Sequence, residues 1–328
     1  MTILTRRDFL SRSALGAGAM AFSAAMPAPG AASAPAIGKP APAYYRYQLG
    51  SFELTAIHDG VWRRPVDDQF VRNAPFSQVR KALADAFMPR DTLTIPFTPL
   101  LVNAGSKLVL IDTGSGGQIA PTAGSFGDNL AAAGIDPKAI DTILISNFHP
   151  DHINGIKTKE NALVFPNAEI LVPHKEWVFW MDNANFRQAQ SDMIKAYFLN
   201  VRRIFADIRN RITPFVPDRE VAPGINAIDA PGHTPGHCVY AIASGSQAMM
   251  ALCDTTNHPW LFARHPGWQP IVDQDGPLAV KTRKRLLDRV SADKMLVHGY
   301  HFPFPGVGHI VRTRSGYDFV PEMWRAEL

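Results

Sequence analysis

Clusters of histidine and aspartate that sit beside predicted strands constrain this chain most. The apolar run from Thr142 to Ile145 predicts a buried strand, and it leads directly into His149, Asp151 and His152. Further candidates, most of them just past a predicted strand, are His233, Asp254, His298 and His301. Because polar groups at strand ends gather along one edge of an α/β sheet, we expect these distant side chains to meet in one site.

The rest of the chain supports a single domain built from strands and helices. Strands are predicted over residues 52–57, 100–103, 107–112, 142–145, 168–172, 239–243, 248–252 and 295–297, and helices over residues 77–88, 128–133, 192–212 and 278–290. These elements alternate without repeats, and no Pro/Gly linker separates them, so one α/β domain with a sheet-rich core is the simplest architecture. A hydrophobic content of 46% in 328 residues suits such a core.

The N-terminus has the pattern of an export signal. Arg6 and Arg7 precede an apolar run from Ala14 to Met26, and small residues lead to Pro35. This resembles a twin-arginine signal peptide over residues 1–34, which implies a periplasmic or secreted protein; a frayed or membrane-anchored N-terminus is the alternative. The apolar run is too short for a permanent membrane span. We expect an extended lead-in over 35–43 and the folded domain over 44–328.

Net charge limits the classes of binding partner, and cysteine content limits the number of disulfide bonds. Removing residues 1–34 takes away three arginines and one aspartate, which lowers the formal net charge from +4 to +2 and leaves no case for nucleic acid as a partner. The basic run at 281–285 falls in a predicted helix, where a solvated helix face is the better interpretation. Cys238 and Cys253 flank a predicted two-residue turn, so a cross-strand disulfide is open, but two buried thiols are favoured.

The residue types of the clusters indicate a metal site. Neutral imidazoles and carboxylates are the ligands that zinc and related divalent ions prefer when thiolates are absent. A carboxylate placed between two metal ions can bridge them, and such a pair can hold and deprotonate a water molecule at neutral pH. We therefore predict one or two Zn²⁺ ions per chain, with another divalent ion as the alternative, and a small-molecule substrate.

The motifs resemble those of a known family. His149-x-Asp151-His152 after an apolar strand is similar to the H-x-H-x-D-H motif of the metallo-β-lactamase superfamily, and residues 111–114 and 232–237 resemble its neighbouring motifs. Segments 44–53, 106–112 and 301–310 look most like the methyl parathion hydrolase group. The resemblance implies an α/β fold, the αβ/βα sandwich of two packed mixed β-sheets flanked by helices, and a homodimer would fit the family.

The resemblance also implies a set of metal ligands. One ion would be held by Asn147, His149 and His233, the other by Asp151, His152 and His301, with Asp254 bridging both. The match to the segment Phe-Pro-Gly-x-Gly-His selects His301 over His298 as the last ligand. Three further residues, Asp112, His237 and His298, are expected to support the ligands rather than bind metal.

Asn147 departs from the family pattern, which has histidine at this position. An amide oxygen is a weaker zinc ligand than imidazole, so the first metal site should be weakened while the second keeps its full set. Three possibilities follow: a binuclear site with an asparagine ligand, a working mononuclear site, or a site that no longer catalyses. The remaining ligand positions all match the motif, which argues against loss of catalysis.

A bridging Asp254 argues against β-lactam hydrolysis, because β-lactamases of this fold lack that bridge. The resemblance implies a hydrolase that uses metal-bound hydroxide on lactones or aryl esters and also accepts organophosphate triesters, with Asp151 or Asp254 as proton acceptor. The alternatives are a dedicated organophosphate triesterase of the methyl parathion type and a non-catalytic metal-binding homologue. Trp180, Phe198 and Trp260 are predicted to form aromatic walls of the substrate pocket, with ordinary core packing as the alternative.

Overall fold

The computed structural model describes residues 37–189, 191–324 and 327. The predicted signal peptide therefore lies outside the described residues. The chain divides into two units, Met1–Pro40 and Ala41–Leu328, and the fold below is that of the second unit. Within the described residues, no helix has both the length and the apolar character needed to cross a bilayer.

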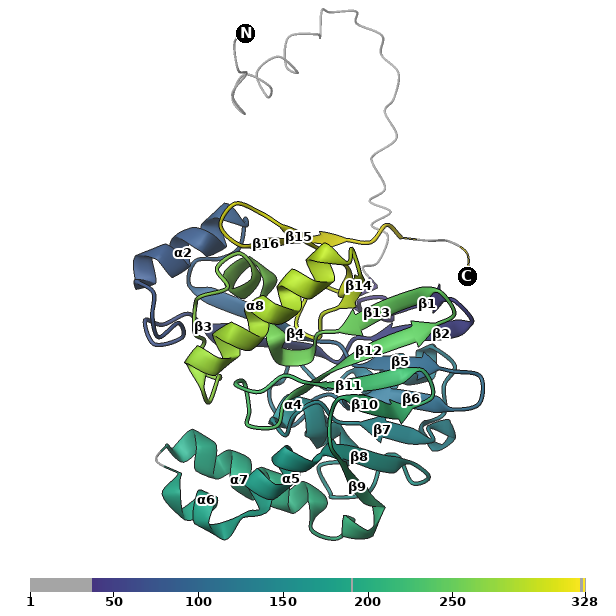
Figure 1. The fold of residues 1–328 in the computed structure, drawn as a ribbon. Coiled ribbons are helices and arrows are strands. Elements are labelled where there is room, and N and C mark those ends of the chain that lie inside the picture. Colours follow the sequence, from purple (N-terminus) through teal and green to yellow (C-terminus); the bar gives the residue numbers. More distant parts are fainter. Residues whose placement is uncertain (1–36, 190, 325–326, 328) are drawn as a thin grey trace, which may run out of the picture. The chain divides into compact units, whose positions relative to one another are not determined.

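The first large sheet has the strand order β1-β2-β5-β6-β7-β8-β9 (Figure 1). Its strands are β1 (Tyr44–Leu49), β2 (Phe52–Ile57), β5 (Leu100–Asn103), β6 (Leu108–Ile111), β7 (Thr142–Leu144), β8 (Glu169–Pro173) and β9 (Ile212–Phe215). Pairing is antiparallel from β1 to β6 and parallel from β6 to β9. The sheet is therefore mixed, and its parallel part carries the first ligand loop.

The second large sheet has the order β10-β11-β12-β13-β14-β15-β16. Its strands are β10 (Arg219–Ala222), β11 (Ile225–Asp229), β12 (Cys238–Ser244), β13 (Gln247–Ala251), β14 (Leu296–His298), β15 (Val307–Arg312) and β16 (Tyr317–Pro321). Only the β13–β14 pair is parallel among its described pairs. A separate two-stranded antiparallel sheet pairs β3 (Gly60–Pro65) with β4 (Thr92–Phe97).

Helices flank the two large sheets, and α2 packs instead beside the small β3–β4 sheet. The helices are α2 (Phe76–Asp85), α3 (Phe126–Ala132), α4 (Pro150–Ile153), α5 (His174–Met181), α6 (Asn183–Gln188), α7 (Asp192–Phe205) and α8 (Gly276–Ala292). Single helical turns are η1 (Pro137–Ala139), η2 (Asn154–Ile156), η3 (Arg209–Arg211), η4 (Cys253–Thr255) and η5 (Pro259–Ala263). The apolar faces of α5 and α7 pack on the first sheet and that of α8 on the second. These contacts bury the helices on one side only.

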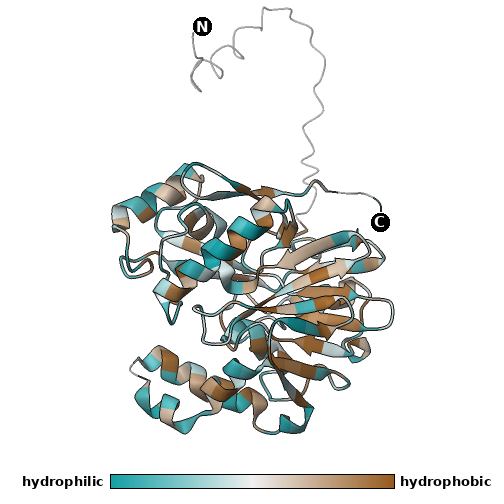
Figure 2. Ribbon diagram, in the orientation of Figure 1, coloured by the Kyte–Doolittle hydropathy of each residue, from teal (hydrophilic) through white to brown (hydrophobic). Residues whose placement is uncertain are grey.

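The central core lies between the two sheets. Val102 and Ile111 of the first sheet meet Tyr240 and Met249 of the second in one buried cluster. In Figure 2 the strands are largely hydrophobic, whereas the visible face of α8 is largely hydrophilic. Burial on both faces of each sheet explains the apolar runs in the sequence. The predicted sandwich of two mixed sheets flanked by helices is confirmed.

Two sequence predictions need correction and one is supported. The helix predicted over 192–212 ends at Phe205, because Ile212 pairs with Ile170 of β8 and begins β9. Arg283 of the basic run is 1% exposed, so the solvated-face interpretation is wrong for that residue. Cys238 and Cys253 are free and buried, as favoured from the sequence.

Candidate metal centre

Four loops bring the predicted ligands to one place. The loop after β7 supplies His149, Asp151 and His152, and the loops before β12, after β13 and after β14 supply His233, Asp254 and His301. Two sets of three residues have ligand atoms within 4.8 Å of one another. We call His149, His233 and Asp254 the first group, and Asp151, His152 and His301 the second group. The loops therefore form two adjoining candidate metal sites.

Three of the histidines are each oriented by a hydrogen bond at Nδ1. This atom lies 2.8 Å from Asp112 Oδ2 in His152, 2.9 Å from Asp273 Oδ1 in His233 and 2.8 Å from the Pro96 carbonyl in His301. A carboxylate or carbonyl oxygen can only accept, so Nδ1 carries the proton in each ring. In the neutral form of each ring, which is the form that binds metal, the lone pair is thus placed at Nε2.

Each of these lone pairs faces the carboxylate of Asp254. The Nε2 atoms of His152, His233 and His301 lie 2.8, 3.0 and 2.6 Å from its oxygens. Lone pairs and carboxylates at such distances repel unless a cation or proton lies between them. Burial lowers the pKa of His233, but Asp254 and Asp273 outweigh it and raise that pKa to about 10. The side chains present therefore fit divalent metal ions held by both groups.

Asn147 presents its amide nitrogen to this centre. Its Oδ1 accepts a hydrogen bond from the His149 backbone N–H at 2.9 Å, and its Nδ2 donates to Asp254 Oδ2 at 2.7 Å. A flipped amide would place two donors together and two acceptors together, so the orientation is fixed by its neighbours. Asn257 Nδ2 donates to the other oxygen of Asp254 at 3.1 Å. The amide oxygen of Asn147 is thus turned away from the first group, unlike the predicted metal ligand.

The expected supporting residues contact the ligand loops to different degrees. The Asp112 carboxylate accepts from the Ser146 backbone N–H at 2.8 Å as well as from His152. His237 donates through Nδ1 to the Ala230 carbonyl and accepts at Nε2 from the backbone N–H of Asp254. His298 is buried at the end of β14 but belongs to neither group. Its carbonyl accepts from the Leu252 N–H at 2.8 Å, which is a contact between strand ends.

Glu176 of α5 was not predicted from the sequence and ties two ligand loops together. Its buried carboxylate accepts from the backbone N–H of Phe148 at 3.0 Å and of Gly236 at 2.7 Å. Burial raises the pKa of Glu176, and these hydrogen bonds oppose the rise. A single acidic residue in a helix carries no motif, so nothing in the sequence singled it out.

Asp59, which directly precedes β3, positions another loop beside the centre. It accepts from the backbone N–H of Ser115 at 2.7 Å and of Phe126 at 3.0 Å. A Cβ on Gly114, whose φ is +77°, would lie 2.9 Å from the Asp59 carboxyl carbon. The glycine of the predicted motif at 111–114 is therefore required by this close approach.

A cavity of about 310 Å³ opens beside both metal groups. Residues from each group line it, among them His149, Asp151 and His301. Its apolar wall consists of Trp62, Phe70, Ile95, Phe97, Ile119 and Val272. Its polar wall consists of Gln118, Asn154, Tyr197, Asn200 and Asn257. The cavity has the size and mixed lining of a small-molecule site.

The predicted aromatic walls are not the ones found. Trp180 and Phe198 are fully buried in the core under the first sheet, with ring centroids 4.7 Å apart. Trp260 packs against the ring of His258 at 5.5 Å. None of the three is among the described residues that line the cavity. Apolar periodicity on α7 marked its buried face, whereas the neighbouring residue Tyr197 faces the cavity.

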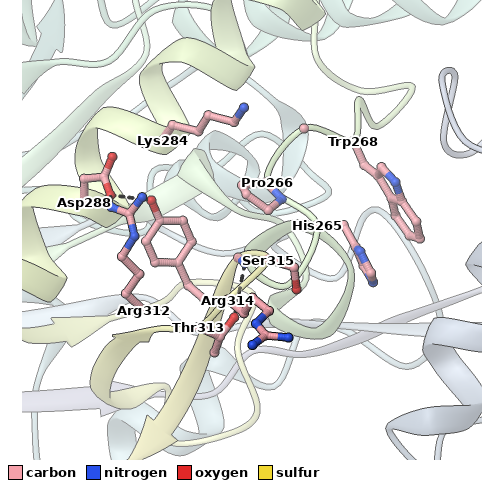
Figure 3. A pocket seen from close by; sticks show the side chains of 12 residues that line it. His265, Pro266, Trp268, Lys284, Asp288, Arg312, Thr313, Arg314 and Ser315 are labelled. Carbon is pink, nitrogen blue, oxygen red and sulfur yellow. Dashed lines mark hydrogen bonds and ion pairs between the residues drawn. The ribbon is translucent and has the colours of Figure 1, made fainter.

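A second cavity, of about 430 Å³, lies between α8 and the turn before β16 (Figure 3). Cationic side chains at its wall are Lys284, Arg312 and Arg314, and Asp288 accepts hydrogen bonds from Arg312 and from Tyr317. His265 stacks on Trp268 at 4.0 Å. Its described lining includes no residue of either metal group, so the metal chemistry belongs to the first cavity.

Comparison with known proteins identifies the family. Residues 99–272 match the family described as the metallo-beta-lactamase superfamily. The chain belongs to this superfamily.

Individual superfamily members share much of the chain. An N-acyl homoserine lactonase of Bacillus cereus is 23% identical over 262 residues, which cover 74% of this chain and 92% of the relative. The solved structure of AidC, a dizinc quorum-quenching lactonase, has a TM-score of 0.81 at 28% identity and covers 86% of this chain and 98% of its own. AbOPH, a hydrolase in the beta-lactamase superfamily, has a TM-score of 0.81 at 27% identity and covers 88% and 100%.

These likenesses and the site together define the class of activity. The chain is a metal-dependent hydrolase of the metallo-β-lactamase fold. The histidines and aspartates of the first and second groups are side chains able to bind metal.

Proposed function

We propose that this chain is a lactonase that works with two zinc ions. The observation that carries the proposal is the position of Asp254, whose carboxylate lies between both metal groups at a cavity with an apolar wall. The relatives named as lactonases support the choice of lactones. An apolar wall beside a polar centre suits an ester ring that carries an acyl or aryl substituent.

The chain's own residues have distinct tasks at this centre. Bound ions would supply an activated water and would polarise the acyl oxygen of the substrate. Asp254 is engaged at both oxygens by Asn147 and Asn257. Asp151 lines the cavity and is partly exposed, which makes it the better placed of the two predicted carboxylates to take up a proton.

Tyr197 is suited to donate a hydrogen bond to the substrate. It lines the cavity 5.0 Å from the ring of His149, and its hydroxyl makes no hydrogen bond to any other described residue. Burial, and then the Asp151 carboxylate, raise the pKa of Tyr197 to about 12, so the phenol keeps its proton at neutral pH. Tyr197→Phe should lower kcat on lactones roughly tenfold without changing zinc content, the factor expected for one hydrogen bond of about 1.4 kcal/mol.

The experiment that tests the function is a set of initial rates on dihydrocoumarin and on an N-acyl homoserine lactone. Protein lacking residues 1–34 is assayed after zinc reconstitution and after chelator treatment, side by side. A zinc-dependent rate well above the uncatalysed rate supports a lactonase. No rate on either lactone from protein with zinc shown to be bound would reject it.

A second candidate is supported by the aromatic side chains of the same wall. Trp62, Phe70 and Phe97 offer flat apolar surfaces to aryl groups, which suits aryl esters and organophosphate triesters. Because the segments at 44–53, 106–112 and 301–310 resemble the methyl parathion hydrolase group, we propose that the chain is related to it.

If kcat/KM is higher on methyl parathion than on every lactone tested, the chain is a dedicated triesterase. Zinc binding without turnover of lactone, aryl ester or triester would leave the non-catalytic alternative.

We further propose export by the twin-arginine route and assembly as a homodimer. The paired Arg6 and Arg7 support export, and likeness to the family supports a dimer. Cell fractionation of the full chain beside a variant carrying Arg6→Lys and Arg7→Lys tests export, because the substituted chain should stay in the cytoplasm. Light scattering of the purified protein tests the dimer, which a monomer mass would reject.

A further inference from the structure

Arg283 is a buried cation whose hydrogen bonds tie α8 to several segments, two of which carry ligands of the first metal group. It lies on α8 with 1% exposure. Its Nε donates to the Thr255 carbonyl at 2.9 Å, its Nη1 to the carbonyls of Pro266 and Trp268, and its Nη2 to Asp273 Oδ2 at 3.0 Å. A buried charge is costly to desolvate and adds little to net stability even when paired. Its retention here therefore invites a functional explanation.

Two of these bonds lead directly to ligands of the first group. Asp273 accepts from Arg283 with one oxygen and contacts His233 Nδ1 at 2.9 Å with the other. Thr255 follows Asp254 in the chain, so the bond from Nε fixes the turn that carries the bridging carboxylate. One guanidinium thus restrains both an imidazole ligand and a carboxylate ligand.

The loop of His233 is also fixed to the beginning of α8 through its backbone. Gln274 N–H donates to the His233 carbonyl at 2.9 Å, and Thr282 Oγ1 donates to the Pro231 carbonyl at 2.7 Å. Gly232 has φ +124°, and a Cβ there would lie 2.2 Å from the backbone nitrogen of Ala279. The loop therefore packs directly against the helix that carries Arg283.

Arg283 also fixes the orientation of the Asp273 carboxylate. Because Oδ2 of Asp273 accepts from Arg283, Oδ1 is directed at His233 Nδ1, and the opposite ring atom, Nε2, lies 3.0 Å from Asp254. The first group has three protein ligands, because the oxygen of Asn147 is turned away. Two of those three depend on Arg283.

We propose that Arg283 and Asp273 are positioning residues that orient His233 and Asp254 for metal binding in the first group. The inference rests on metal binding at the proposed active site and does not depend on which substrate is hydrolysed. It predicts that loss of either residue weakens the zinc affinity of the first group more than that of the second, to which Asp254 is also adjacent. A larger loss of metal from the first group would separate this role from a general contribution to folding.

The test measures zinc binding rather than turnover. Stepwise zinc affinities of the domain are obtained by chelator competition for Arg283→Met, Arg283→Lys and Asp273→Asn. His149→Ala and His301→Ala identify which affinity belongs to which group. The matched control is Arg289→Met on the same helix, whose partner Asp293 is 4.0 Å away and whose side chain is 49% exposed. Circular dichroism establishes that each variant is folded.

We expect the first-group affinity to fall about 10- to 100-fold in Arg283→Met and in Asp273→Asn, as for other residues that orient metal ligands. Arg283→Lys keeps the charge but not the planar fork, so its loss should be smaller. The second-group affinity should fall less, because Asp254 is also adjacent to His152 and His301 whereas His233 belongs to the first group alone. Both affinities of the control should stay within about twofold. Unchanged first-group affinity in folded variants, or an equal fall of both affinities, would overturn the proposal.

Two further measurements cover a variant that does not fold and a failure of the proposed lactonase function. If Arg283→Met does not fold, the double variant of Arg283→Met with Asp273→Asn removes the unpaired buried charge and is measured instead. Selective loss of zinc in a protein without lactonase activity would support the positioning role and reject the proposed lactonase function. Lactonase activity without selective loss of zinc would support the lactonase function and reject the positioning role.

Discussion

At the scale of single residues, Asn147 shows where sequence reasoning ends. The motif identified the position and the missing imidazole, but an amide can present either an oxygen or a nitrogen to a neighbour. The backbone N–H of His149 takes the oxygen, and the nitrogen is left to donate to Asp254. That choice depends on loop geometry that the order of residues does not display.

Restoring the family's histidine should therefore strengthen zinc binding. In Asn147→His, an imidazole replaces an amide that offers no oxygen to the first group, so we expect the affinity of that group to rise at least about tenfold. Chelator competition measures it, with His301→Ala used to remove the second group. We expect the lactonase rate at saturating zinc to stay within a few-fold, because saturating zinc offsets the weaker affinity of the natural site. The substitution also removes the hydrogen bond from Asn147 to Asp254, which opposes any gain in rate.

Other outcomes for Asn147→His would change the interpretation. Unaltered affinity would contradict the idea that the first group lacks a ligand. A rate that rises in proportion to affinity would mark the natural centre as a site that had lost catalysis.

At the scale of elements, hydrophobic patterning located most strands and several helices. The predicted strand 52–57 coincides with β2, and the predicted hairpin over 100–112 corresponds to β5 and β6. The helix predicted over 192–212 is too long because β9 is defined by pairing with β8, a long-range contact. The buried position of Arg283 was missed for a similar reason, since one basic residue in a charged run looks like its solvated neighbours.

Glu176 allows a prediction about how α5 holds the ligand loops. In Glu176→Gln, an amide NH₂ replaces one of two oxygens that together accept from Phe148, Gly236 and the Trp180 indole. At least one buried N–H then loses its acceptor, which should destabilise the fold by about 1–3 kcal/mol.

Urea unfolding of the zinc-loaded protein measures this loss. Glu160→Gln, at an exposed position, serves as the control and should change stability by less than about 0.5 kcal/mol. Equal unfolding midpoints for the two variants would show that Glu176 does not hold the loops.

At the scale of the whole molecule, the sequence predicted the candidate metal ligands better than the residues that hold the ligand loops in place. His149, His233 and His301 carry motifs because each follows or precedes a strand at the same edge of the sandwich. Asp59, Glu176 and Asp273 reach the same centre only through tertiary packing, and each is a lone acidic residue along the chain. The cavity wall was missed because burial and exposure to a cavity give similar apolar patterns.

Metal removal should lower the stability of the entire domain. Asp112, Asp151 and Asp254 bring several buried or partly buried carboxylates to one centre, and zinc binds the native arrangement but not the dispersed loops. Zinc at about 100 times its Kd adds about 2.7 kcal/mol, which corresponds to a Tm shift of about 5–10 °C. Thermal unfolding before and after chelation measures the shift, with zinc re-addition as the control. An unchanged Tm would contradict metal binding in these loops.

The two thiols have a consequence for where the protein can mature. Cys238 and Cys253 are free, and burial raises the pKa of each well above that of an ordinary thiol. Since only a thiolate exchanges disulfides or is readily oxidised, both sulfurs are chemically inert in the folded domain. The native state thus needs no enzyme that forms or rearranges disulfide bonds. The domain can fold under reducing conditions, and its two thiols stay unchanged under oxidising ones.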